Sequence, residues 1–228
     1  MKLWDKNNSV NEKIIEFTVG DDRLNDLYLI KYDVKASISH AKMLYRSNLL
    51  SEIECDKIIN ILNEILSQAE AGELKIEKEF EDMHSKIEYI LTDKLGDIGK
   101  KIHTARSRND QVLVSIQLYL IDELNFIKTE VKSLFDLLIN LAKKNKNNIM
   151  PGYTHMRAAM PSSFGLWFSA YAEILIDDVI SLNSTIEIIN QNTLGSAAGY
   201  GTSFNIDRDF TTNDLNFKTL KYNSLACQ

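Results

Sequence analysis

Three short stretches of this sequence gather the residue types that could do chemistry. They are residues 81–88, 99–111 and 152–160, and they hold three of the chain's four histidines. The fourth, His40, falls in an earlier predicted helix. Elsewhere the sequence follows amphipathic helical patterns, so these breaks mark the candidate functional residues.

The second stretch leads into a long predicted helix, with residues 107–110 at its start. Ser107, Asn109 and Asp110 are good caps, so one interpretation is simply a capped helix. Arg106 and Arg108 fit that interpretation poorly, because the start of a helix disfavours cations. Two guanidinium groups, a hydroxyl, an amide and free backbone N–H groups would together form a receptor for a carboxylate.

The third stretch places Thr154 and His155 between Pro151 and Pro161. Because proline interrupts helices, this spacing predicts a stiff loop between two long helices. A histidine titrates near neutral pH and therefore suits proton transfer. A single histidine is more often structural, and that alternative stays open. On chemistry alone, the residues indicate an anion-binding helical protein.

The elements that must position these stretches are helices. Apolar residues step by three and four over residues 110–146, which predicts a helix roughly 55 Å long at about 1.5 Å per residue. A second long helix follows Ser162 and Ser163, which can cap it. No period-two alternation is evident, so the predicted fold class is all-α, a helical bundle. Three shorter helices are predicted at residues 22–49, 52–69 and 81–95.

The apolar stripes of the two long helices are wider than one helical hairpin needs. We therefore expect partner helices from other subunits. The residues that lie off the first seam are Leu118, Phe126, Leu137, Trp167, Ile174 and Ile180.

Composition limits the kind of partner and the compartment. The chain has 228 residues and a formal net charge of −6, which argues against a nucleic-acid partner. Cys55 and Cys227 match no metal spacing and indicate no disulfide framework. The sequence has neither an apolar signal core nor a run long enough to span a membrane. We expect a soluble, cytoplasmic protein with no membrane contact.

Four segments, in order, match the motifs of a known family. They are Glu81-Asp82-Met83-His84-Ser85, the run from Lys100 through Ser107-Arg108-Asn109-Asp110-Gln111, Met150-Pro151-Gly152-Tyr153-Thr154-His155, and Leu194-Gly195-Ser196-Ala197-Ala198-Gly199. On these segments, and over nearly its whole length, the sequence resembles the argininosuccinate lyases of the fumarase/aspartase superfamily. The Ser-Arg-Asn-Asp-Gln and Gly-Tyr-Thr-His motifs are the ones specific to this branch.

The resemblance implies a cofactor-free, metal-free reaction, the reversible β-elimination of argininosuccinate into arginine and fumarate. It implies that Ser107, Asn109 and Thr154 stabilise charge that builds on a carboxylate. His155 is implied as the general acid or as the activator of the base. Asp26 would face the arginine part of the substrate. The implied catalytic residues are Ser107, Thr154 and His155, and the implied substrate-binding residues are Asp26, His84, Arg108, Asn109 and Thr154.

The sequence departs from the family pattern at a few positions. Ala105 stands where the family usually has glycine, and Arg157 and Met160 stand where glutamines are common. The family's third segment, Gly-Ser-Ser-x-Met-Pro-x-Lys-x-Asn-Pro, is not present in these 228 residues. That segment supplies the serine favoured as the base and a lysine that binds a substrate carboxylate.

We therefore expect the N-terminal half of such an enzyme. Residues 1–107 would form an N-terminal helical domain, and residues 108–228 part of a central bundle. The full-length protein is expected to be a homotetramer in which three subunits build each site, and the 228 residues alone are expected to be inactive. Two alternatives stay open, a non-catalytic fragment and a related lyase that acts on another succinyl substrate.

Overall fold

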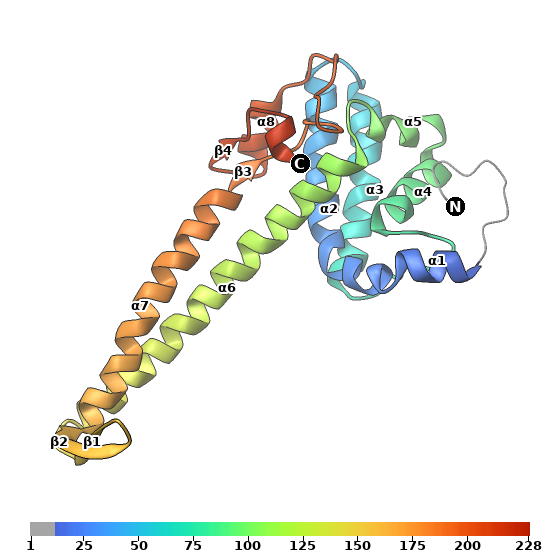
Figure 1. The fold of residues 1–228 in the computed structure, drawn as a ribbon. Coiled ribbons are helices and arrows are strands. Elements are labelled where there is room, and N and C mark those ends of the chain that lie inside the picture. The colour runs from blue at the N-terminus through green and yellow to red at the C-terminus, as the bar shows by residue number, and fades with distance from the viewer. Residues whose placement is uncertain (1–11) are drawn as a thin grey trace. The chain divides into compact units, whose positions relative to one another are not determined.

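A computed structural model describes residues 12–228 of the chain (Figure 1). Within these residues the fold is helical, which confirms the predicted all-α class. The α-helices are α1 Glu12–Val19, α2 Asp22–Arg46, α3 Glu52–Glu70, α4 Met83–Leu95, α5 Asp97–Lys100, α6 Arg108–Lys144, α7 Phe164–Ile189 and α8 Arg208–Asp214. The short elements are the 3-10 helices η1 Lys101–His103 and η2 Leu225–Cys227, and the strands β1 Ile149–Thr154, β2 Arg157–Ser163, β3 Gln191–Asn192 and β4 Thr219–Leu220.

Side-chain caps explain where several helices begin. Ser51 and Glu54 form a reciprocal capping box at α3, each accepting a backbone N–H of the other. Helix α4 begins two residues later than predicted because Asp82 caps it and accepts the N–H of Ser85 at 2.8 Å. Ser163 accepts the N–H of Leu166 at 3.1 Å at the start of α7, as its position after Pro161 predicts.

The chain divides into two compact units. One joins the chain up to Tyr119 with Asn190–Gln228, and the other is Leu120–Ile189. Helix α6 contributes to both units. The sequence-based domain boundary at residue 107 stays a prediction.

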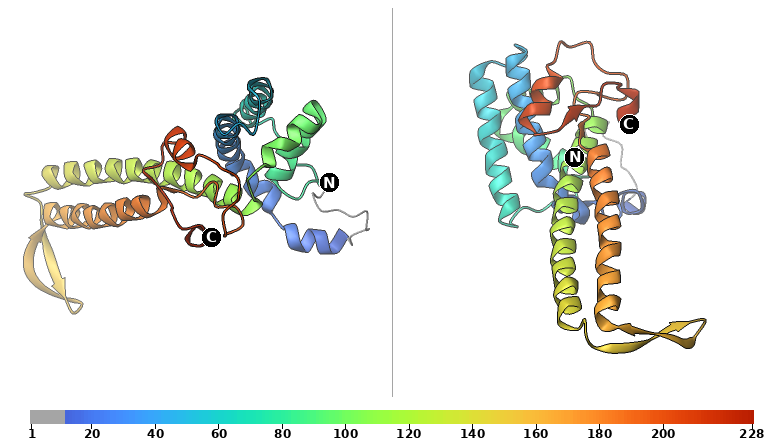
Figure 2. Two further views of the ribbon diagram at one scale, coloured as in Figure 1. Left: turned by 90° about the horizontal axis from the view of Figure 1, so that it is seen from above. Right: turned by 90° about the vertical axis from the view of Figure 1, so that its left-hand side faces the viewer.

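The first unit has its core between α2, α3 and α4, which pack side by side (Figures 1 and 2). These helices bury apolar residues at spacings of three and four, as an amphipathic helix requires. Both cysteines of the chain, Cys55 and Cys227, are buried and free. The largest core side chains include Ile30, Leu44, Ile58, Leu62, Ile87 and Leu91.

In the second unit, the part of α6 from Leu120 onward runs antiparallel to α7 (Figure 2). Lys128 on α6 donates to the side-chain oxygen of Asn183 on α7 at 2.8 Å. A groove of ≈640 Å³ runs between the two helices, and its lining includes Val131, Phe135 and Val179. Most of the off-seam residues are strongly exposed here: Phe126, Leu137, Trp167, Ile174 and Ile180.

The stiff loop predicted between the two prolines is a β-hairpin, so the expectation of a segment without strands is wrong. Strands β1 and β2 pair antiparallel, with Pro151 opposite Pro161. Both strands are edges of a two-stranded sheet, where a proline without an N–H is tolerated. A bulge between Pro151 and Tyr153 further interrupts the alternation. These prolines and this bulge hide the period-two pattern in the sequence.

Within the part of the chain that the structure describes, no helix combines the length and apolar character needed to cross a membrane.

Candidate functional site

The segment before α6 carries the candidate carboxylate receptor. Ser107 caps the helix, because its Oγ accepts the N–H of Asn109 at 3.3 Å. Ser107 is half-buried, and Asn109 is exposed and donates to the side chain of Gln228 at 2.9 Å. The capped-helix interpretation therefore holds, and the segment also keeps polar groups on its surface.

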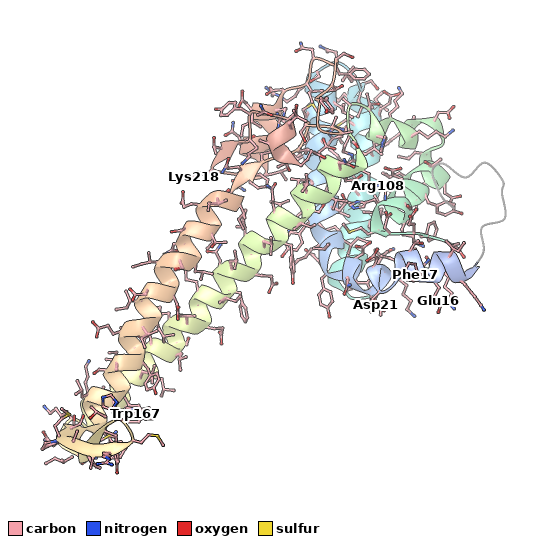
Figure 3. The ribbon with its side chains drawn as sticks, in the orientation of Figure 1. Glu16, Phe17, Asp21, Arg108, Trp167 and Lys218 are labelled. Atoms are coloured by element: carbon pink, nitrogen blue, oxygen red, sulfur yellow. The ribbon has the colours of Figure 1, made fainter. Side chains whose placement is uncertain are left out.

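Arg108 is the cation that this segment presents. Figure 3 labels it at the start of α6. Its Nη1 donates to a carboxylate oxygen of Asp82. Its Nε and Nη2 are buried and form no hydrogen bond among the described residues. An unpaired buried guanidinium nitrogen is costly, and these two donors suit a bidentate carboxylate ligand.

Asp82 holds Arg108 from the start of α4. Its other oxygen accepts both the N–H and the hydroxyl of Ser85 at 2.8 Å. Burial alone would raise the pKa of Asp82, but the Arg108 guanidinium and the Ser85 hydrogen bonds lower it below its ordinary value. Asp82 is therefore ionised near neutral pH, and the pair fixes the guanidinium in place.

Asp26 and His84 lie at the same end of α4. Asp26 accepts the N–H of Met83 at 2.8 Å. Burial raises the pKa of Asp26 above its ordinary value, although this hydrogen bond acts to lower it. His84 is buried, and its Nδ1 lies 3.0 Å from a carboxylate oxygen of Asp33 on α2. The first unit thus brings Asp26 and His84 together with the receptor segment.

Asp110 fastens the receptor segment to a second loop. It is fully buried, and one oxygen accepts the N–H of Ser107 at 2.9 Å. The other oxygen accepts the N–H groups of Gly195 and Ala197 at 2.8 and 3.0 Å. One carboxylate therefore joins two of the segments that resemble the family, whereas the sequence predicted only a helix cap at Asp110.

Thr154 and His155 belong to the other unit, at the turn of the hairpin. Thr154 pairs with Arg157, which leaves His155 and Met156 as the two central turn residues. Their φ angles are 48° and 63°, so both adopt the left-handed conformation of a type I′ turn. Both side chains are exposed. A non-glycine pair here is strained, which is often a property of functional segments.

The left-handed conformation also explains why the family usually has glycine where this chain has Ala105. Ala105 has a φ of 58°, which glycine adopts without strain. Arg157 begins β2 and is exposed, and Met160 lies opposite Gly152 in the hairpin. Residues 12–228 contain no group of three or more histidine, cysteine, aspartate or glutamate residues that could hold a metal ion.

Comparison with known proteins places this helical chain in a class. A family model described as Lyase matches residues 14–226, and the chain belongs to this lyase family. The argininosuccinate lyase of Phocaeicola vulgatus is 52% identical over 100% of this chain and 51% of its own length. That of Thermotoga neapolitana is 45% identical over 100% of this chain and 57% of its own length. The chain thus spans about half the length of these relatives, and the predicted resemblance is confirmed.

Solved structures share the fold. An EDDS lyase variant with bound fumarate superposes with a TM-score of 0.80 at 24% identity, over 97% of this chain and 44% of its own. A fumarate lyase:delta crystallin from Brucella melitensis gives a TM-score of 0.77 at 18% identity, over 97% and 52% of the two chains. At these identities the likeness concerns the fold alone.

Proposed function

We propose that this chain is part of a cytoplasmic argininosuccinate lyase, which converts argininosuccinate reversibly into arginine and fumarate. The observation that carries the proposal is the receptor at the start of α6. There, two buried donors of Arg108 have no hydrogen-bond partner within residues 12–228, while Asp82 holds the guanidinium in place. The similarity to argininosuccinate lyases across 100% of the chain supports the same substrate.

The elimination breaks a carbon–nitrogen bond and forms a carbon–carbon double bond. A base removes the proton beside a substrate carboxylate, and negative charge builds on that carboxylate's oxygens. In the proposal, Arg108, Ser107 and Asn109 bind those oxygens and stabilise the charge. The departing guanidino nitrogen accepts a proton as its bond to carbon breaks. The base itself is not assigned to a residue of this chain.

We assign proton transfer to His155, with Thr154 as a further donor to the substrate. Both are exposed at the turn of a hairpin, where they are open to a partner surface. Asp26, with its raised pKa, and buried His84 would shape the part of the site that faces the arginine moiety. The 37 residues of α6 separate the two groups along the chain, which supports a site completed by another subunit.

A homotetramer is the assembly that we propose for the whole protein. The exposed apolar residues of α6 and α7 and the groove between them support such packing. Figure 3 labels Trp167, one of these residues, near the hairpin end of α7. Trp167 is 45% exposed in the single chain, which is a large apolar surface to leave in water.

The test is fumarate release from argininosuccinate, followed by ultraviolet absorbance in the complete gene product. His155→Asn should lower kcat at least about a hundredfold, since a proton transfer of this kind contributes that much. Met156→Asn is the matched control, because it puts the same residue at the neighbouring position of the same turn. A change of less than about tenfold in His155→Asn would remove this histidine from the mechanism. No fumarate from the unmodified protein would contradict the proposed reaction and favour a non-catalytic role.

A further inference from the structure

Helix α2 carries a polar stripe that the proposed reaction does not use. Asp33, Ser37 and His40 are spaced by four and three residues, so their side chains lie on one face of the helix. All three are fully buried, at 0% exposure. Burying three polar groups on one face of a core helix is unfavourable unless each has a partner.

Each member of the stripe contacts one residue of the segment 104–111. His40 Nε2 lies 2.9 Å from the carbonyl oxygen of Thr104. Arg106 Nη1 donates to Ser37 Oγ at 2.9 Å. The contacts are all within the first unit of the fold.

The third contact closes the other end of the segment. Gln111 Nε2 donates to the two carboxylate oxygens of Asp33 at 2.9 and 3.2 Å. Two contacts thus precede the receptor residues 107–109 and one follows them. A segment held on both sides has little freedom to reorient what lies between.

The protonation states of the stripe are fixed near neutral pH. Burial and the nearby Arg106 lower the pKa of His40 to about 3, so its ring is neutral. A carbonyl only accepts, so the proton of the neutral ring is on Nε2 and is donated to Thr104. Burial would raise the pKa of Asp33, but His84, Arg106 and Gln111 lower it below the ordinary value. A neutral donor and an ionised acceptor of this kind suit positioning rather than proton transfer.

The segment also needs to be held, because it contains a strained residue. Ala105 has a φ of 58° and lies between Thr104 and Arg106, the two residues that α2 binds. A left-handed alanine persists only where its surroundings impose it.

We propose that Asp33, Ser37 and His40 are positioning residues, which hold Ser107, Arg108 and Asn109 in the geometry that binds a substrate carboxylate. The inference rests on the proposed function for its consequence in turnover. The structural part of the inference, that α2 keeps the receptor segment ordered, can be tested without substrate.

Two serines of α2 provide the sharpest test. Ser37 contacts Arg106, whereas the hydroxyl of Ser39 is buried and forms no hydrogen bond among the described residues. In the complete protein without ligand, Ser37→Ala should speed amide hydrogen exchange of residues 104–111 about tenfold, because the hydrogen bond that Ser37 accepts from the charged Arg106 is lost. Ser39→Ala removes the same atoms two positions away and should leave these rates unchanged. Equal rates in the two variants would overturn the inference.

Turnover of argininosuccinate gives the second readout. Ser37→Ala should lower kcat/KM about tenfold, since a small misplacement of binding groups is costly, and Ser39→Ala should stay within about twofold. His40→Gln retains an N–H for Thr104 and should keep kcat/KM within about threefold, whereas His40→Leu should lose it as Ser37→Ala does. Equal losses of kcat/KM in the His40→Gln and His40→Leu variants would mean that His40 only fills space in the core, and would overturn its positioning role. An unmodified protein that makes no fumarate would refute the proposed function, while the exchange rates would still decide the positioning.

Discussion

Replacing Asp110 by asparagine should destabilise the first unit by removing a charge that three backbone groups share. Asp110 is fully buried and accepts the N–H groups of Ser107, Gly195 and Ala197. Asparagine offers only one acceptor oxygen. That oxygen would serve Gly195 and Ala197, and the new NH₂ group would face the N–H of Ser107.

The magnitude follows from this geometry. One charge-assisted hydrogen bond is lost, at about 1.5–3 kcal/mol, and two others become neutral, at about 1 kcal/mol each. Burying a neutral amide is cheaper than burying a carboxylate, and this offsets part of the loss. We expect a net loss of about 2–4 kcal/mol in the free energy of unfolding.

Thermal unfolding measures the change. For a chain of this size the unfolding midpoint should fall by about 5–15 °C, at about 2–4 °C per kcal/mol. Asp97→Asn is the control within the same unit, because Asp97 is 94% exposed and its ion pair with Lys100 lies at the surface. Its midpoint should not move. A fall of less than about 2 °C in Asp110→Asn would mean that the shared carboxylate does not hold the two segments together.

Three further outcomes test other parts of the fold. Met156→Gly should stabilise the hairpin by about 0.5–1 kcal/mol, measured by amide exchange. Glycine removes the cost of the left-handed conformation, and the larger conformational entropy of glycine in the unfolded chain cancels only part of that gain. No packing is lost, because Met156 is 96% exposed. An unchanged exchange rate would mean that the turn is not left-handed. Gly165→Ala should lower the unfolding midpoint, at a cost of about 1–3 kcal/mol, since its Cβ would lie 2.6 Å from the Cα of Lys146; an unchanged midpoint would show that this approach is not so close. Because the pKa of His40 in the folded state is about 3, below its ordinary 6.5, the unfolded chain takes up the proton first and stability is lost as the pH falls from 6.5 toward 3. His40→Gln should remove about 1 kcal/mol per pH unit from that slope between pH 6 and 4.5, and an unchanged slope would refute a buried neutral histidine.

The helices could be predicted because their signals are local. The apolar period of three and four residues, Ser163 after Pro161 and the box of Ser51 and Glu54 all act within a few residues of one another. The predicted range 110–146 accordingly lies within two residues of α6 at each end.

What the sequence could not predict depends on residues far apart along the chain. The hydrogen-bond partner of His40 is Thr104, which lies 64 residues further along the chain, and that of Asp33 is Gln111, which lies 78 residues further. Nothing near either residue in the sequence identifies its partner. The one local signal was the polar face itself, Asp33 with Ser37 and His40 at four and seven residues, within the part of α2 that is mostly buried, from Ile30 onward. A polar stripe at core positions predicts a specific partner even when that partner is unknown.

The two arginines before and at the start of α6 illustrate why position along the chain does not decide role. The sequence treats Arg106 and Arg108 alike, as cations at a helix start that disfavours them. Arg106 is buried, with an exposed fraction of 6%, and its Nη1 donates to Ser37 on α2, although its Nε has no hydrogen-bond partner among the described residues. Arg108 donates to Asp82 and keeps two donors without a hydrogen-bond partner among the described residues. Asp110 in the first turn supplies the negative charge that the helix dipole favours. One guanidinium therefore orders the segment and the other is left to bind, so substituting Arg106 should disturb folding and substituting Arg108 should disturb substrate affinity.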